Sequence, residues 1–235
     1  MSRHIFRLTS YMNIPQFLAD GAVWAKNHDP MQPCFQTSYA GIVERRGTEE
    51  FQTPCDSVVN DFVPFYFSPI TAMAYAIHVG NVSLRDVNGE EIRTATSEDI
   101  VFLVSITDHF ENADLPFYFT NVACNNRVEI PRFENDLAKI GTHIDWSLFD
   151  EAPYKAMIPE IGYNGVCQYF HSRDVGVHGN RSAQRMAEFM VRDELPLRYI
   201  DCIITKTAAI KAIVEQQIQA SHWDIPVHAK QDCYF

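Results

Sequence analysis

Residues 60–81 restrict the possible folds of this chain most strongly, because a strand signal there runs directly into a helix signal. The stretch reads NDFVPFYFSPITAMAYAIHVGN. Phe62 to Phe67 form an apolar run rich in aromatic and β-branched residues, which is typical of a strand covered on both faces. Pro64 has no N–H to donate, so we expect an edge or bulge position for it.

The second half of this stretch predicts a helix that begins at Pro69. Ser68 offers a hydroxyl N-cap, and proline suits the first helical position because its φ is already fixed near the helical value. Gly80 provides a stop signal. The residues that share one face at helical spacing are Ala72, Met73, Ala76 and Ile77. We interpret this strand–helix junction as one face of a nucleotide site.

Further strands and helices are predicted on both sides of this junction, which indicates a mixed α and β fold. Residues 5–12 predict a strand, followed by a short helix with Asn13 as its N-cap and Gly21 as its stop. Residues 26–57 predict a long connection with little regular structure. The remaining predictions are strands at 100–106, 187–191, 199–205 and 225–235, and helices at 131–140 and 207–220. We expect one domain over residues 1–235.

The composition argues against a broad nucleic-acid-binding surface, since the net charge is −11 and phosphate binding usually requires a basic surface. A local exception lies between His171 and Arg185, where three arginines accompany one acid. No apolar run is long enough to span a bilayer or to act as a signal peptide, so a cytoplasmic location is expected.

Cysteine and histidine spacing predicts neither disulfides nor a metal site. The six cysteines are scattered and form no C-x-x-C pair, so free thiols are expected. His171 and His178 have no third ligand nearby in the sequence, and zinc normally needs at least three protein ligands.

Glu188 is the most unusual ionisable residue, because it lies inside the apolar segment MAEFMV. A strand there would direct its carboxylate into a core or a cavity, and buried acids are either paired or functional. An ion pair with Arg181 or Arg185 and a catalytic role are equally compatible with the local sequence. The common glycine-rich phosphate loops, the G-x-S-x-G motif and the H-E-x-x-H motif are all missing from the sequence.

Four segments together resemble the DarT family of bacterial DNA ADP-ribosyltransferase toxins. They are RLTSYMNIPQFLADG, VERR, DFVPFYFSPITAMAYAIHVGN and QRMAEFMV, and they are followed by the terminal Tyr234-Phe235. The resemblance spans nearly the whole chain. It implies an α+β ADP-ribosyltransferase fold, with split, largely antiparallel β-sheets flanked by helices.

The resemblance also implies NAD as co-substrate and no metal. Carried onto this sequence, it implies that Glu188 is the catalytic glutamate and that Arg46 lies near the pyrophosphate of NAD as part of the same machinery. Tyr75 is implied to stack on nicotinamide. The complete set of NAD-binding residues implied in this way is Arg7, Thr9, Asn13, Arg46, Tyr66 and Tyr75.

A base in single-stranded DNA is the implied acceptor, with residues 162–185 as the substrate loop. Many relatives carry histidine where this chain has Arg7, a departure that leaves a guanine-directed and a thymine-directed branch both open. A macrodomain antitoxin that reverses the modification is the implied partner. The rival interpretations are transfer to protein or RNA and a catalytically idle nucleotide-binding module; Glu188 argues against the second. The implied DNA contacts are Arg173, His178, Arg181 and Arg185.

Overall fold

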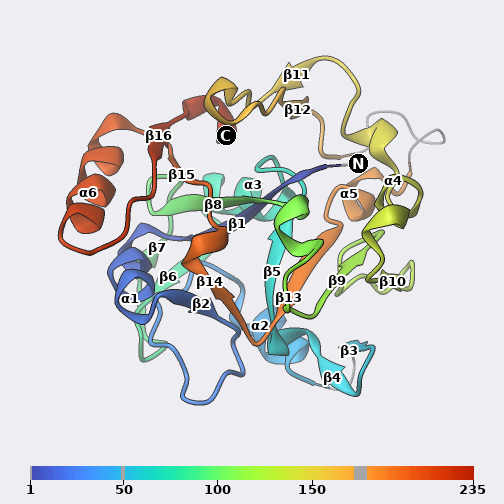
Figure 1. Cartoon of the computed structure of the whole chain (residues 1–235), viewed down its shortest axis with the longest axis horizontal. Helices are drawn as coiled ribbons and strands as arrows, with labels where there is room; N and C mark the ends of the chain where they lie inside the picture. The colour runs from blue at the N-terminus through green and yellow to red at the C-terminus, as the bar shows by residue number, and fades with distance from the viewer. Residues whose placement is uncertain (1, 49–50, 172–178) are drawn as a thin grey trace.

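An eight-stranded sheet runs through the middle of the structure, a computed structural model that describes residues 2–48, 51–171 and 179–235 (Figure 1). Its strand order is β10-β9-β13-β5-β1-β8-β15-β16, and every neighbouring pair is antiparallel except β15–β16. In chain order these strands are β1 (His4–Ser10), β5 (Phe62–Tyr66), β8 (Ile100–Ile106), β9 (Phe117–Thr120), β10 (Phe133–Glu134), β13 (Glu188–Arg192), β15 (Cys202–Thr205) and β16 (Val227–Ala229). The expected α+β class with a mostly antiparallel sheet is confirmed.

Small two-stranded sheets and short helices surround this sheet. The paired strands are β2 (Ala22–Trp24) with β14 (Glu194–Pro196), β3 (Gln52–Thr53) with β4 (Ser57–Val58), β6 (Ser83–Arg85) with β7 (Glu91–Thr94), and β11 (Tyr154–Lys155) with β12 (Val166–Cys167). The helices are α1 (Ile14–Asp20), α2 (Ala40–Arg46), α3 (Ala72–His78), α4 (Ile140–His143), α5 (Arg181–Gln184) and α6 (Ala208–Gln219). Within the described residues, no helix is long and apolar enough to cross a bilayer.

The core forms around β8, the most continuously apolar strand. β8 pairs with β1 over the full length of β1, and all of its residues except Ile106 are buried. On the far side of β15 and β16, α6 buries Ile210, Val214 and Ile218. Figure 1 shows α6 beside α1, where the indole N–H of Trp223 donates to the carbonyl of Leu18 at 3.1 Å. The helix at 207–220 was therefore predicted well, with Thr207 as its observed N-cap.

β5 is an inner strand, so the edge position expected for Pro64 is wrong. Proline is tolerated there because β5 pairs with β1 through Phe6 and Tyr66 alone. The carbonyl of Pro64 accepts a hydrogen bond from the Arg7 guanidinium at 3.1 Å. Pro64 therefore has no main-chain partner on β1, so its missing N–H leaves no hydrogen bond between the two strands unmade.

Helix α3 begins at Ala72, three residues later than predicted. The Ser68 hydroxyl accepts from the N–H of Ile70 at 2.9 Å, so it closes a local turn instead of capping a helix. Thr71 takes the extended backbone of an N-cap, and its hydroxyl accepts from the N–H of Ala74. Ser68 and Thr71 both have side chains that can cap a helix, and Thr71 is the one that occupies the N-cap position.

Three other element predictions need correction. The connection at 26–57 contains helix α2 as well as strands β3 and β4. The helix expected at 131–140 is replaced by strand β10 and a 3₁₀ turn, because the side chain of Asn121 accepts from the N–H of Arg132 beside β9 and Asp136 caps the turn. The last antiparallel strand begins at Cys202, since residues 197–199 form another 3₁₀ turn.

Candidate active site

Glu188 begins strand β13 and forms a buried ion pair with Arg46 from the end of helix α2. The two guanidinium Nη atoms of Arg46 donate to the two carboxylate oxygens at 3.1 and 2.6 Å. This two-point geometry is the strong form of an arginine–carboxylate contact. The ion-pair alternative considered for Glu188 is thus realised, but with Arg46 as its partner instead of Arg181 or Arg185. Arg46 and Glu188 are separated by 142 positions in the sequence.

The backbone around Glu188 fixes its carboxylate further. The N–H of Cys124 donates to Oε1 of Glu188 at 3.0 Å, and the Glu188 N–H donates to the Thr120 hydroxyl at 3.1 Å. A carboxylate offers about four acceptor positions. Of the hydrogen bonds from Arg46 and the Cys124 N–H, Oε1 receives two and Oε2 receives one.

A cavity of about 240 Å³ lies beside this ion pair. It lies between the β1 strand, helix α2 and strand β5, and it has both apolar and polar walls. The side chains that matter for the chemistry of this cavity are Arg7, Thr9, Asn13, Arg46, Tyr66 and Met73. Five of these six were predicted to contact NAD, and the structure brings them together at one site. Concave sites with a few convergent polar groups are the usual form of ligand sites.

Arg7 is the second arginine of the cavity, which Lys26 also lines. Its Nη1 donates to the carbonyl of Pro64, and no acidic side chain of the described residues pairs with it. Burial lowers the pKa of Arg7 to about 10, and the nearby charge of Arg46 contributes to this shift. A buried guanidinium without a carboxylate partner is well suited to an anionic ligand group.

Asn13 organises the polar wall of the cavity, but it does not cap α1 with its side chain. Its amide nitrogen donates to the Thr9 hydroxyl at 3.1 Å and to the carbonyl of Phe35 at 2.9 Å. Its amide oxygen accepts from the N–H of Phe35 at 2.7 Å. These contacts tie strand β1 to the segment that follows β2, so Asn13 shapes the rim of the cavity.

Charge around Glu188 controls the protonation of its neighbours. Burial lowers the pKa of Arg46, but the charge and hydrogen bonds of Glu188 raise it by more, so this guanidinium remains charged. Burial, followed by the negative charge of Glu188, raises the pKa of the Tyr66 hydroxyl and of the Cys124 thiol. Both groups therefore stay protonated, and Cys124 is not a competing nucleophile.

Tyr75 is the predicted NAD-binding residue that does not line the cavity. It is 44% exposed on α3, and its ring centroid lies 5.4 Å from that of Phe170 and 5.3 Å from that of Phe235. The stacking role therefore remains a prediction without a cavity contact. On the same helix, Met73 faces the cavity, two residues before Tyr75.

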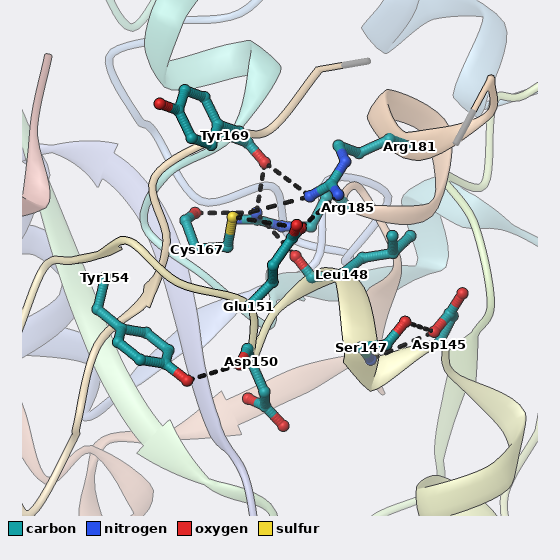
Figure 2. A network of polar contacts seen from close by, with 10 residues as sticks. All are labelled: Asp145, Ser147, Leu148, Asp150, Glu151, Tyr154, Cys167, Tyr169, Arg181 and Arg185. Carbon is teal, nitrogen blue, oxygen red and sulfur yellow. Dashed lines mark hydrogen bonds and ion pairs between the residues drawn. The ribbon is translucent and has the colours of Figure 1, made fainter. Parts of the chain in front are cut away.

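Arg181 and Arg185 are buried, so their expected contact with DNA is wrong for this structure. Figure 2 shows both guanidinium groups directed at the interior. Arg181 donates to the carboxylate of Glu151 at 2.5 Å, and Arg185 donates to carbonyls of the chain itself. The sequence counted both as surface charge, because the polar residues around them suggested an exposed loop.

The remaining predicted contacts fall partly outside the described residues. Arg173 and His178 both lie in the stretch 172–178, which the structure does not describe. His171 is exposed and packs beside Phe170. Among the residues that the structure does describe, no group of three His, Cys, Asp or Glu side chains is placed to hold a metal ion.

Sequence reasoning missed two hydrogen-bond partners of Glu188, an acceptor on strand β9 and a donor on the segment after it. Thr120 and Cys124 contribute a hydroxyl and a backbone N–H, which carry no motif that could be recognised. The partner Glu151 of Arg181 likewise comes from an irregular segment. The roles of Thr120, Cys124 and Glu151 become apparent in the folded structure, where their segments contact Glu188 and Arg181.

A sequence model of the DarT family, described as "ssDNA thymidine ADP-ribosyltransferase, DarT", matches residues 6–235 of this chain. A protein of Thermus sp. (strain 2.9) named "DNA ADP-ribosyl transferase" is 31% identical over 157 residues, which cover 67% of this chain and 68% of that protein.

Two solved structures share the fold. "Thermus sp. 2.9 DarT in complex with ADP-ribosylated ssDNA" superposes with a TM-score of 0.74 at 23% identity, covering 99% of this chain and 96% of that one. "Thermus sp. 2.9 DarT in complex with NAD+" gives a TM-score of 0.70 at 24% identity, covering 99% and 97% of the two chains.

Proposed function

The chain belongs to the DarT family of NAD-dependent DNA ADP-ribosyltransferases, and we propose that it transfers ADP-ribose from NAD to a thymine base in single-stranded DNA with Glu188 as its catalytic residue. The observation that carries this proposal is the buried Glu188 held by Arg46, because Arg46 itself lines a cavity that also contains Arg7. Thymine is favoured over guanine because the family description names thymidine.

The cavity residues fit a dinucleotide donor. We assign Arg7 to an anionic group of NAD, since it is a cavity arginine on the central strand β1 that no described acid neutralises. Thr9 and Asn13 form the polar wall, and Tyr66 and Met73 supply the apolar surface that a nicotinamide ring requires. NAD supplies the ADP-ribosyl group and nicotinamide as the leaving group.

Glu188 stabilises the positive charge that develops on the ribose when the bond to nicotinamide breaks. In this proposal a ribose hydroxyl donates to the carboxylate, which places the negative charge beside the reacting carbon. Arg46 holds this carboxylate in one orientation through two parallel hydrogen bonds. A nitrogen of the thymine base forms the new bond to the ribose carbon, and nicotinamide leaves with the bonding electrons. The proton of that nitrogen is released to a proton acceptor.

Several expectations from the sequence go beyond these residues. A macrodomain antitoxin as partner and a cytoplasmic location both stay predictions, as does transfer to protein or RNA as the alternative reaction. The DNA contacts expected from Arg173 and His178 also stay predictions.

The decisive experiment supplies labelled NAD with oligonucleotides that differ only in one base. We expect a single strand with one thymine to be labelled. At least tenfold less label is expected on the same strand with guanine in place of that thymine, on duplex DNA, on RNA and on protein. A paired and stacked base must be extruded first, which costs a few kcal/mol. Labelling of the guanine strand instead of the thymine strand would move the protein to the guanine-directed branch. Labelling of protein alone would contradict the DNA acceptor.

The matched variant in this experiment is Glu188→Gln. The neutral amide keeps the size of the side chain but does not stabilise developing positive charge, so we expect transfer to fall by about a thousandfold. NAD binding, measured by titration calorimetry, should change much less. Near-normal transfer by this variant would remove Glu188 from the mechanism.

A further inference from the structure

Arg185 is a buried cation that several oxygens of the chain solvate in place of a carboxylate. Its Nη1 donates to the carbonyls of Leu148, Cys167 and Tyr169 at 3.3, 3.0 and 2.9 Å. Its Nη2 donates to the Ser68 hydroxyl at 3.2 Å and to the carbonyl of Ile70 at 3.3 Å. No acid of the described residues forms an ion pair with it, and burial lowers its pKa to about 10. An isolated buried charge is costly, so its retention calls for a reason.

Four of the five oxygens that Arg185 contacts belong to two segments, one on the NAD side of the proposed site and one on its expected DNA side; the fifth is the carbonyl of Leu148. Residues 68–70 directly follow β5, the strand that bears Tyr66, and lead into α3, whose Met73 lines the NAD-side cavity. We call residues 68–70 the donor-side segment. Residues 167–171 lie immediately before the stretch 172–178 and belong to the loop expected to meet DNA. We call them the acceptor-side segment, and Figure 2 shows Tyr169 reaching the guanidinium groups from it.

The donor-side segment is also held by contacts that do not involve Arg185. β5 lies between β13 and β1 in the large sheet, Ser68 closes its own turn, and Thr71 caps α3. The acceptor-side segment is attached outside the large sheet. In the described part of the chain, β12 pairs with β11 in a separate two-stranded sheet, and the N–H groups of Cys167 and Gln168 donate to the carbonyls of Phe149 and Pro153. Loss of Arg185 should therefore displace the acceptor side more than the donor side.

Arg181 provides an internal comparison. It lies one helical turn before Arg185 and also donates to the carbonyl of Tyr169, at 3.4 Å. Its other partners are Glu151 and the sulfur of Cys167. In the described part of the chain it makes no hydrogen bond to the donor-side segment, so it contacts one side of the site where Arg185 contacts both.

We propose that Arg185 is a positioning residue for transfer: its planar fork holds the acceptor-side segment at a fixed place relative to the donor-side segment, three residues before Glu188. This inference rests on the proposed function and deepens it. Lysine does not replace the fork, because its three donors share one nitrogen, which cannot occupy both Nη positions at once.

The test compares Arg185→Lys with the matched control Arg181→Lys. For Arg185→Lys we expect kcat/KM for a thymine-containing single strand to fall at least tenfold, mainly through a higher KM for DNA. The Kd for NAD, measured by calorimetry without DNA, should stay within about threefold of the unsubstituted protein. Arg181→Lys retains its charge beside Glu151 and should lose less than threefold in kcat/KM. A merely structural role would reduce NAD binding and transfer together.

Equal losses in the two variants, or equal loss of NAD binding and transfer in Arg185→Lys, would overturn the inference. If thermal melting shows that Arg185→Lys does not fold, Ser68→Ala is used instead, since it removes one acceptor of Nη2. It should raise the KM for DNA at unchanged NAD affinity, and an unchanged KM would count against the inference. If the unsubstituted protein does not modify the strand, the proposed function fails as well. If it does and Arg185→Lys matches it, only the inference fails.

Discussion

At the scale of single residues, the site depends on how a buried carboxylate is held in one orientation beside its counter-charge. Glu188 is inaccessible to bulk water, and Arg46 supplies both its counter-charge and two of its three donors. Buried ion pairs are worth little as net stabilisation, but removal of one partner is expensive because it leaves the other charge uncompensated. The value of this pair is therefore in the geometry of Glu188.

Arg46→Lys separates charge from geometry at this pair. Lysine retains the positive charge but loses the second, parallel hydrogen bond, so the carboxylate is free to rotate. We expect transfer to fall at least tenfold, which corresponds to about 1.4 kcal/mol in the barrier. The matched control is Arg45→Lys, because the Arg45 guanidinium contacts only the carbonyl of Gly41 in the described structure. Steady-state kinetics should give near-normal transfer for the control. A loss in Arg45→Lys alone would show that the wrong arginine of the adjacent pair has been assigned.

At the scale of secondary structure, the local sequence pattern correctly predicted the elements whose apolar residues mostly face the core. β8 was predicted from continuous apolar character and α6 from a cap and one apolar face, and both are observed. The errors arise where a local signal competes with a tertiary one. Pro64 is accepted in an inner strand because β1 and β5 barely pair, and residues 131–140 lose their helix to pairing with β9.

The same reasoning explains how much of the site was predictable. Glu188 stood out because a charge inside an apolar strand is rare, and Arg7, Thr9 and Asn13 came from the family resemblance. The roles of Arg181 and Arg185 were not predictable, because burial of a charged side chain depends on segments 30 and 117 residues away, such as those of Glu151 and Ser68. The sequence immediately around Arg181 and Arg185 does not indicate that these distant segments contact them.

The turn between β7 and β8 gives a prediction at this scale. Asp99 is buried and accepts from both Nη atoms of Arg93, at 2.7 and 2.6 Å, and from the N–H of Thr96 at 2.7 Å. Burial raises the pKa of Asp99, but the hydrogen bonds from Arg93 and Thr96 lower it by more, so the net shift is downward. We expect Asp99→Asn to reduce the free energy of unfolding by about 1–3 kcal/mol at pH 7.

The pH dependence of that loss has a definite sign. Because the folded-state pKa of Asp99 is depressed, its stabilising contribution is fully present above the unfolded pKa of about 3.9 and disappears as the pH falls through the lower folded value. Denaturant titrations should therefore show the full difference between Asp99→Asn and the unsubstituted protein at pH 7 and 5, and a smaller one near pH 3. The exposed neighbour Glu98, changed to Gln, should shift stability by less than about 0.5 kcal/mol. A constant difference down to pH 3 would contradict this account.

At the scale of the whole molecule, the acidic balance determines how a nucleic acid can be held. There are 19 lysines and arginines against 30 aspartates and glutamates. Several of the cations are already engaged within the fold, for example Arg3 with Asp150, Arg46 with Glu188 and Arg181 with Glu151. Few positive charges are left for phosphates, so a single strand must be held largely through its bases, by stacking and hydrogen bonds.

The salt dependence of single-strand binding tests this conclusion. Each neutralised phosphate contributes a slope of about −0.7 to a plot of log affinity against log salt concentration for single strands. Two or three phosphate contacts would give a slope of about −1.5 to −2, which is shallow beside the slope of about −10 known for a strongly basic DNA binder. The measurement is fluorescence anisotropy with a labelled thymine-containing strand between about 50 and 300 mM salt, with NAD omitted so that no transfer occurs. A strand of equal length without bases should bind much more weakly, because the stacking contribution is lost while the phosphates remain. A slope steeper than about −4, or equal binding of the strand without bases, would mean that phosphate contacts dominate and that cations outside the described residues, such as Arg173, supply them.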